Sequence, residues 1–337
     1  MKTAFITGVT GMVGSHLLDF LVSNTNWVIH CLIRWRSPLD NIQQHIESIN
    51  KEKRIFLHYG DLRDKQSLDI FFKQVKPNYI FHLAAQSFPK TSFSSPVDTY
   101  ETNIIGTQNI LQSIREFSPK SLIHVCSSSE VFGRVHKDKV PISEDCSFHP
   151  ASPYAISKTG TDLIGKFFFE AYNLKVIITR MFTHTGPRRG DVFAESSFAK
   201  QIAMAEAGLT NGSIYVGNLK SLRTISDVRD AVKAYFMLLT VKPKPGEVYN
   251  IGGDYSVTLE KLLDDLIKKS TIKEKLKIKL DKNRLRPIDA DLQVPCTKKF
   301  RSHTGWKPEI KYDKTITDLL EFWREKIINQ KKKFLTR

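Results

Sequence analysis

The chain has 337 residues, of which 41% are hydrophobic and 10% aromatic, so it can bury the core of one large domain or of two unequal lobes. No apolar run approaches the roughly eighteen residues that a membrane span needs, so we expect no membrane partner. The formal net charge is +16, but residues 261–337 alone hold 22 Lys or Arg against 11 Asp or Glu. An amphipathic pattern there predicts a closing helix over 313–330, followed by a solvated tail with Lys331 to Lys333. The excess charge therefore indicates a solvated surface, and we expect no nucleic-acid partner.

Short β-branched or apolar runs alternate with helix-length stretches through the first half of the chain, which predicts a parallel sheet wrapped by helices. After about residue 185 the pattern becomes less regular. We therefore predict an α/β protein with a first domain over 1–185 and a smaller lobe over 186–337, with the chain crossing between them. The expected strands are Thr3–Thr7, Val28–Ile33, Ile55–His58, Tyr79–Leu83, Leu122–Cys126 and Val176–Thr179. Helix-like stretches in the second half are 193–207, 227–240 and 258–269.

The cysteines bear on the compartment in which the protein works. They are scattered without any CxxC pair, which predicts free thiols in a reducing environment. Glycines interrupt the apolar run near the N-terminus, so that run does not resemble a signal peptide. We expect a cytoplasmic protein without a metal site. The four cysteines are Cys31, Cys126, Cys146 and Cys296.

The first expected strand runs directly into a glycine-rich turn, Thr7-Gly8-Val9-Thr10-Gly11-Met12-Val13-Gly14, after which a helix begins. Gly8, Gly11 and Gly14 allow a tight turn and let backbone N–H groups approach a pyrophosphate at the positive end of that helix. The GxxGxxG spacing is typical of short-chain dehydrogenases. The turn therefore predicts a dinucleotide site on a Rossmann-type doubly wound parallel sheet, with the smaller C-terminal lobe binding the substrate.

The end of the second expected strand indicates which dinucleotide binds. Sites that prefer NAD usually place an acidic residue there to bind the ribose 2′-hydroxyl. This chain has Arg34 and Arg36 instead, and two guanidinium groups suit a 2′-phosphate. We expect NADP as the cofactor; NAD, with the two arginines merely exposed, stays open as the alternative.

Tyr154 and Lys158 stand four residues apart, and Pro153 can begin a helix that carries both side chains on one face. A nearby ammonium favours the phenolate, so Lys158 is expected to lower the pKa of Tyr154 and make it a general base. The strand before this helix ends with Ser128 and Glu130, at the sheet edge where open α/β sheets bind ligands. The alternative for this pair is a polar turn that faces solvent.

Taken together, these residues resemble the extended short-chain dehydrogenases that act on nucleotide sugars, above all the GDP-mannose 4,6-dehydratases. The likeness covers nearly the whole chain. Further similar segments are His58-Tyr59-Gly60-Asp61-Leu62, Ala85-Gln86-Ser87, Ser92-Phe93-Ser94-Ser95-Pro96, Pro187-Arg188-Arg189-Gly190, Gly217-Asn218-Leu219, Ser221-Leu222-Arg223, Arg286-Pro287 and Gly305-Trp306-Lys307-Pro308.

The resemblance implies roles for residues that no motif above explains. On the cofactor side, Asp61 and Leu62 would contact the adenine, Asn103 would order the active-site helix, and His184 would contact NADP. On the substrate side, the diphosphate of a GDP-sugar would bind to two arginines. The substrate residues that it implies are Arg223 and Arg286 for the diphosphate, Lys200 for the nucleotide and Ser87 for the sugar.

The resemblance also implies a reaction. Tyr154 would take the C4 hydroxyl proton while hydride passes to NADP⁺, giving a 4-ketone whose oxygen Ser128 polarises. Glu130 would remove the acidified C5 proton and return a proton to the departing C6 hydroxyl. The stored hydride would then add at C6. Related dehydratases pack the loop from Arg34 to Asn41 against a neighbour's cofactor site, which implies a homodimer or homotetramer.

Two departures from the family pattern, one alternative substrate and two alternative functions remain. Thr183 replaces an asparagine and Phe132 a tyrosine of the family pattern, so a GDP-manno-heptose is an alternative to GDP-mannose as the substrate. Reductases of GDP-4-keto-6-deoxymannose resemble the chain almost as well and can carry the same glutamate. A non-catalytic Rossmann protein that senses NADP or binds RNA is the third reading, although its active-site residues would have to be idle.

Overall fold

A computed structural model gives the fold, and it describes residues 1–51, 54–288 and 290–335, the side chains of 330–335 excepted. Within these residues, a seven-stranded sheet has the order β10-β6-β5-β4-β1-β2-β3, and all its strands are parallel. The order reverses between β1 and β4, and ligands bind beyond the carboxyl ends of the strands at such a point. The expected Rossmann-type sheet is confirmed. The strands are β1 Thr3–Thr7, β2 Val28–Ile33, β3 Ile55–Tyr59, β4 Tyr79–His82, β5 Leu122–Ser128, β6 Val176–Met181 and β10 Val248–Ile251.

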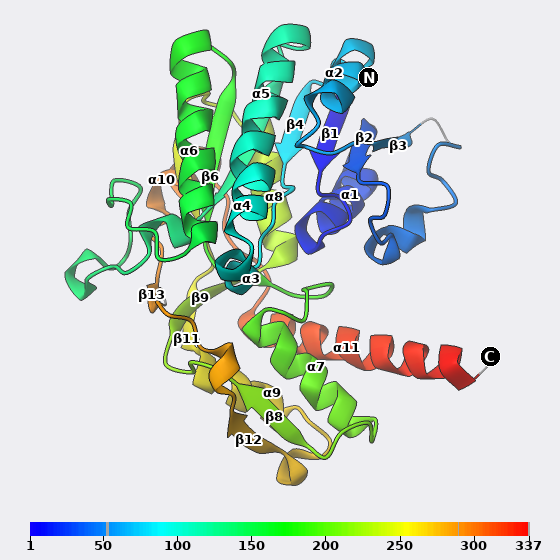
Figure 1. Ribbon diagram of the computed structural model, residues 1–337, viewed down its shortest axis with the longest axis vertical. Helices are drawn as coiled ribbons and strands as arrows, with labels where there is room; N and C mark the ends of the chain where they lie inside the picture. Colours follow the sequence, from blue (N-terminus) through cyan, green and yellow to red (C-terminus); the bar gives the residue numbers. More distant parts are fainter. Residues whose placement is uncertain (52–53, 289, 336–337) are drawn as a thin grey trace.

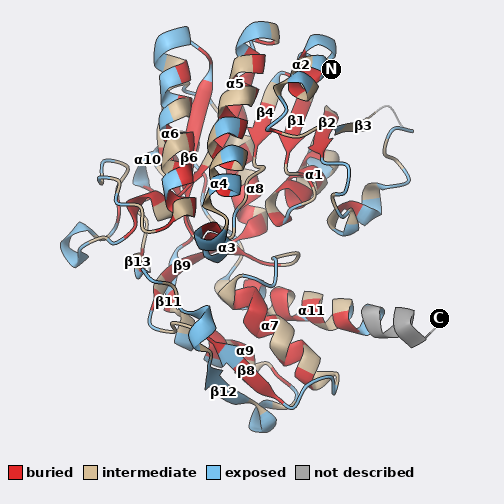
Figure 2. Ribbon diagram, in the orientation of Figure 1, coloured by how far each residue is buried: buried red, intermediate tan, exposed pale blue. Residues whose placement is uncertain are grey.

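Helices cover both faces of the sheet (Figure 1). On one face α1 and α8 bury Leu17, Val232 and Leu238 against the sheet, and on the other α2, α5 and α6 bury Phe72, Ile110 and other apolar side chains. Apart from the edge strand β3, the strands between the two layers are mostly buried (Figure 2). These helices are α1 Met12–Asn24, α2 Lys65–Gln74, α5 Gly106–Phe117, α6 Pro153–Tyr172 and α8 Val228–Thr240, with the short α3 Pro89–Ser94, α4 Pro96–Tyr100 and α10 Lys298–Thr304.

A smaller lobe with its own apolar core lies beneath the carboxyl edge of the sheet (Figure 1). The closing helix packs on α7, where Trp323 Nε1 donates to Ser196 Oγ at 2.9 Å and Arg324 pairs with Glu206 at 2.7 Å. Its backbone continues past the predicted end at 330; the side chains of Lys331 to Lys333 lie outside the described residues. The lobe comprises β7 His184–Thr185, α7 Ala194–Glu206, β8 Ser213–Val216, β9 Leu222–Asp227, β11 Tyr255–Thr258, α9 Leu259–Lys268, β12 Lys277–Leu280, β13 Leu292–Gln293 and α11 Tyr312–Leu335.

The chain crosses between the two parts, as the sequence led us to expect, and it does so more than once. The segment 228–251 returns to the large sheet: α8 covers one of its faces and β10 pairs with β6. A boundary after residue 185 therefore does not divide the chain into two structural units. The alternating pattern predicted the elements, but nothing in it says with which sheet a late strand pairs.

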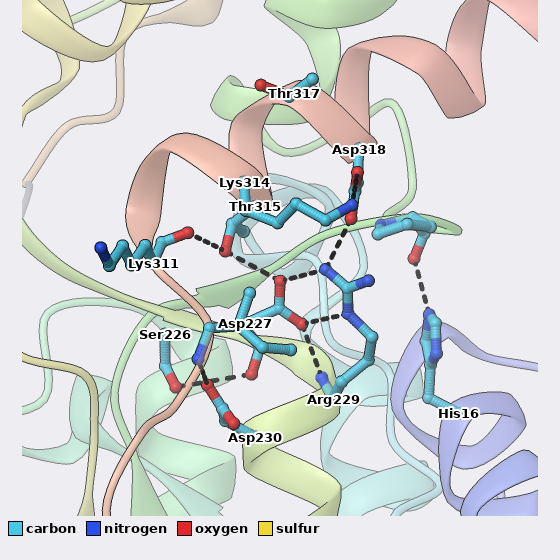
Figure 3. A network of polar contacts seen from close by, with 12 residues as sticks. His16, Ser226, Asp227, Arg229, Asp230, Lys311, Lys314, Thr315, Thr317 and Asp318 are labelled. Atoms are coloured by element: carbon cyan, nitrogen blue, oxygen red, sulfur yellow. Dashed lines mark hydrogen bonds and ion pairs between the residues drawn. The ribbon is translucent and has the colours of Figure 1, made fainter.

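A buried polar network fixes the junction of β9, α8 and α11 (Figure 3). The Asp227 carboxylate accepts from the backbone N–H and side chain of Arg229 at 2.8–2.9 Å and from Thr315 Oγ1 at 2.8 Å. Arg229 also pairs with Asp318 at 2.8 Å. Since this carboxylate accepts from a backbone N–H, a guanidinium and a hydroxyl, the network joins the end of β9 to α8 and α11.

A search of the described residues for a helix long and apolar enough to cross a bilayer finds none.

Candidate active site

The glycine turn at the end of β1 leaves the N-terminus of α1 open to a ligand. Gly8 has a φ of +78°, and a Cβ on it would lie 2.8 Å from the backbone of Ala84 in the loop after β4. A Cβ on Gly14 would lie 2.2 Å from the Gly8 carbonyl oxygen, so both positions require glycine. Asn41 donates to the Thr10 carbonyl at 2.9 Å and fixes the outer side of the turn. This cradle fits the pyrophosphate of a dinucleotide at the positive end of α1.

A cavity of about 640 Å³ runs along the carboxyl edge of the sheet from this turn to the lobe. It brings together side chains from β2, β5, α6, β9 and the 286 region, which lie far apart in the sequence. Fourteen of the residues predicted for the site line it: Gly8, Gly11, Gly14, Arg34, Asp61, Leu62, Ser87, Ser128, Glu130, Tyr154, Lys158, His184, Arg223 and Arg286.

Tyr154 and Ser128 line this cavity and are hydrogen-bonded to each other. Ser152 caps α6 by accepting from the Ala155 N–H, and Pro153 begins the helix, as predicted. Burial raises the pKa of Tyr154 well above its ordinary value, while a hydrogen bond with Ser128 lowers it in part. Lys158 Nζ donates to the Cys126 carbonyl oxygen at 2.5 Å, and burial lowers its pKa. The expected lowering of the Tyr154 pKa by Lys158 is therefore wrong for this arrangement, because desolvation of the phenol outweighs the nearby charges.

Glu130 faces two arginines of the lobe. Its Oε1 lies 3.8 Å from Arg223 Nη1 and its Oε2 lies 3.9 Å from Arg286 Nη1. The carboxylate is only 16% exposed, which contradicts the alternative of a turn that faces solvent. It sits on the turn after β5, where Ser128 Oγ accepts from the Glu130 N–H at 3.2 Å. A base, a hydroxyl and two cations are thus held at one place.

Three predicted residues do not line the cavity. Arg36 is exposed within the turn that starts at Arg34 and ends at Ser37, so of the two arginines only Arg34 lines the cavity. Lys200 points to Asp191, with which it pairs at 2.6 Å. Asn103 is buried behind the site; it accepts from the Gln86 N–H at 2.8 Å.

Asn103 acts at a distance from any ligand. Its Nδ2 donates to the Gln86 carbonyl oxygen at 2.9 Å and to Ser157 Oγ at 2.8 Å. It therefore ties the loop after β4 to α6, the helix that carries Tyr154 and Lys158. This position fits the implied role of ordering the active-site helix.

The loop between β7 and α7 contains the family-like segment Pro187-Arg188-Arg189-Gly190, to which neither a motif nor the resemblance assigns a role. Arg188 and Arg189 both line the cavity. Arg189 Nε lies 3.1 Å from Glu195 Oε1, and its guanidinium lies 3.4 Å from the ring centroid of Phe193. The signal in the sequence is a pair of adjacent arginines directly after Gly186-Pro187, since paired guanidinium groups suit an anion.

The two departures from the family pattern lie at different depths. Thr183 lines the cavity beside His184, whose pKa is lowered to about 4 by burial and by the charge of Arg189. Phe132 is fully buried in a small apolar cluster with Phe182. Phe132 is therefore part of the apolar core, and Thr183 is the departure that lines the cavity.

Comparisons with known proteins agree with this arrangement. A sequence model of the GDP-mannose 4,6 dehydratase family matches residues 5–319. GDP-mannose 4,6 dehydratase 1 of Arabidopsis thaliana is 31% identical over 329 residues, covering 95% of this chain and 89% of that protein. GDP-6-deoxy-D-mannose reductase of Pseudomonas aeruginosa is 28% identical over 324 residues, covering 96% of this chain and 97% of that protein.

Solved structures show the same fold. RMD from Pseudomonas aeruginosa, complexed with NADPH, has a TM-score of 0.81 at 28% identity and covers 97% of this chain and 100% of that chain. A UDP-glucose 4-epimerase of Thermotoga maritima, at 23% identity, has a TM-score of 0.83 over 96% of this chain and 99% of its own. The resemblance drawn from the motifs is confirmed, and the chain belongs to the GDP-mannose 4,6-dehydratase family.

Proposed function

We propose that this protein is a GDP-sugar 4,6-dehydratase that uses NADP. The observation that carries the proposal is the carboxylate of Glu130, which shares one cavity with Ser128, Tyr154 and Lys158 and lies beside two arginines. Elimination of water across C5 and C6 needs a carboxylate beside C5 as well as a proton acceptor at the C4 hydroxyl. A non-catalytic reading would leave this constellation without a purpose.

The chain's own residues divide the reaction as follows. Arg223 and Arg286 bind the diphosphate of the substrate, which brings the sugar between Glu130 and Tyr154. Ser128 donates to the sugar O4 and Tyr154 takes the proton that leaves it. Since burial raises the pKa of Tyr154, charges brought by the ligands have to favour the phenolate.

Glu130 takes the proton from C5 and gives one to the C6 hydroxyl, which leaves as water. When bound, NADP⁺ would supply the hydride acceptor for C4 and then the hydride donor for C6, so the turnover would be redox-neutral. Lys158 and His184 would hold the nicotinamide end; the glycine turn, Arg34, Asp61 and Leu62 would hold the rest of the cofactor. Ser87 is proposed for the sugar. Lys200 pairs with Asp191 and needs to release it before contacting a nucleotide.

A reductase of a GDP-4-keto-6-deoxy sugar is the second candidate. It is favoured by the alignment with the Pseudomonas aeruginosa reductase, in which 324 residues cover nearly all of both chains. Several dehydratases align over more positions, such as 352 residues for the Yersinia enterocolitica protein, because their chains carry insertions. A reductase would consume NADPH stoichiometrically, whereas a dehydratase would not.

The experiment is incubation with GDP-mannose and, separately, with a GDP-manno-heptose, without added reductant, followed by mass spectrometry. Loss of about 18 mass units, one water, from either substrate supports the dehydratase and names its sugar. If Thr183 leaves room for the extra carbon of the heptose, the GDP-manno-heptose is the substrate. Turnover of GDP-mannose with no turnover of the heptose would contradict that alternative. Water loss from neither sugar, with NADPH oxidised on a 4-keto-6-deoxy sugar, would make the protein a reductase.

We further propose a cytoplasmic homodimer or homotetramer. The four cysteines are unpaired, as a reducing compartment favours. Trp35, in the loop from Arg34 to Asn41, is 78% exposed, which is unusual for a tryptophan and suits a subunit contact. For the two binding regions, we propose that 1–185 together with 228–251 holds the cofactor and that the remaining lobe holds the GDP-sugar.

A further inference from the structure

The loop after β7 is held against α1 by an ion pair that no step of the proposed reaction uses. Arg188 has a φ of 68°, in the left-handed region that arginine seldom adopts, so the surroundings must hold it there. Its Nη1 lies 2.7 Å from Asp19 Oδ2 on α1. Arg188 lines the cavity together with Gly11 and Met12, the residues at the N-terminus of α1. Arg188 is thus paired with α1, the helix whose N-terminus is expected to bind the diphosphate of the cofactor.

Asp19 is also held by two side chains of the segment 40–45. His45 Nε2 lies 2.6 Å from its Oδ1, and Gln44 Nε2 donates to the same oxygen at 2.8 Å. Burial raises the pKa of Asp19, but the hydrogen bond with His45 and the charge of Arg188 outweigh it, so its pKa is lowered and it stays a carboxylate. Gln44 and His45 both belong to the segment that follows Arg34, of which Ser37 and Asn41 line the cavity.

The rest of the loop is fastened as well. The Pro187 carbonyl oxygen lies 3.1 Å from Nε2 of His16, which projects from α1 (Figure 3). Burial, and then the charge of Arg188, lowers the pKa of His16 to about 4, so it is neutral and can donate this bond. On the other side Arg189 pairs with Glu195. Of these two arginines, Arg188 is the one that pairs with a carboxylate of α1 and lines the cavity with residues at the N-terminus of that helix.

We propose that Asp19 is a positioning residue, which holds Arg188 so that its guanidinium binds the diphosphate of NADP at the N-terminus of α1. The proposal rests on the proposed function, because it needs NADP to be the ligand. A guanidinium has donors on two edges, so it can keep Asp19 on one edge and contact a phosphate with the other. Because Asp19 also holds the segment after Arg34, it links the supports of the 2′-phosphate and of the diphosphate.

The test is a double-mutant cycle read by NADPH fluorescence, without turnover. The proteins are the wild type, Asp19→Asn, Arg188→Gln and the double variant, and the dissociation constant of NADPH is measured for each. Asp69→Asn is the control, since Asp69 pairs with Lys65 at 2.7 Å on α2 and does not line the cavity. GDP binding to every variant is measured by calorimetry.

Arg188→Gln is expected to weaken NADPH binding about tenfold, as loss of a charge-assisted contact does, and Asp19→Asn to weaken it by a similar factor. The double variant is expected to bind no more weakly than Arg188→Gln, because Asp19 acts through that arginine. The NADPH affinity of Asp69→Asn, and the GDP affinity of every variant, are expected to stay within about twofold of the wild-type values.

The positioning role would be overturned if the double variant weakened NADPH binding by the product of the two single-variant factors. It would also be overturned if Asp19→Asn bound NADPH as tightly as the wild type does. If Asp19→Asn does not fold, Arg188→Gln decides alone: unchanged NADPH binding rejects the proposal, and a selective loss with intact GDP binding supports it. A wild type that binds GDP but no NADPH would overturn the proposed function, and this inference with it.

Discussion

Replacing Glu130 by glutamine separates its two effects, one on catalysis and one on substrate binding. The carboxylate lies 3.8 and 3.9 Å from Arg223 and Arg286, so it occupies the charges that the substrate diphosphate would use. If a phosphate bound the opposite side of a guanidinium at a similar distance, it would lie about 8 Å from the carboxylate. At an effective dielectric of about 20, one unit of like charge at that distance repels by about 2 kcal/mol, and solvent in the open cavity lowers this.

Glu130→Gln is therefore expected to bind GDP about 3- to 30-fold more tightly, while turnover falls by about 10²- to 10⁴-fold. Titration calorimetry with GDP measures the first effect, and detection of dehydrated product measures the second. Glu195→Gln is the matched control: its carboxylate lines the same cavity but pairs with Arg189, so GDP affinity should change by less than about twofold. Unchanged or weaker GDP binding in Glu130→Gln would refute the competition for the arginines.

Four further results are expected. Tyr154→Phe should lower turnover by about 10²- to 10⁴-fold with GDP affinity unchanged; equal turnover would remove it as the proton acceptor. Gly14→Ala should abolish NADPH binding in fluorescence titrations and spare GDP binding, because its Cβ would lie 2.2 Å from a carbonyl oxygen; normal NADPH affinity would contradict the cradle. Arg34→Ala should weaken NADPH binding about tenfold and leave NADH binding unchanged, and an equal effect on both would exclude a 2′-phosphate contact. Burial lowers the pKa of His82 and of His124 to about 3, so the folded protein keeps both neutral while the unfolded chain binds protons below pH 6.5. The free energy of unfolding should therefore fall as pH drops from 6.5 toward 3, by up to about 2 kcal/mol per histidine at pH 5 in urea titrations, and equal stability at pH 7 and 5 would refute this sign.

Local patterns predicted much of the sheet and the centre of the site. The six strands of the first half follow from alternation, and the glycine turn follows from its spacing between a strand and a helix. Tyr154 and Lys158 come together because residues four apart share a helix face. Their meeting with Glu130 needed only the rule that parallel strands bring their carboxyl ends to one edge.

The rest depended on contacts that no local pattern encodes. β10 returns to the large sheet by pairing with β6, and the preceding α8 packs in the same core as α1. The pKa of Tyr154 depends on burial by neighbours from several elements, so spacing from Lys158 alone gave the wrong direction. The resemblance implies a nucleotide contact for Lys200, whereas its pairing with Asp191 is visible only in three dimensions.

The central claim is that one sugar loses water while its own C4 hydrogen moves to C6. The most direct test uses GDP-mannose, and the GDP-manno-heptose if that is the substrate, with deuterium at C4 and no added NADPH. We predict a product about 18 mass units lighter that keeps the deuterium, now at C6. Product that has lost the deuterium, or turnover that requires stoichiometric NADPH, would contradict the dehydratase assignment.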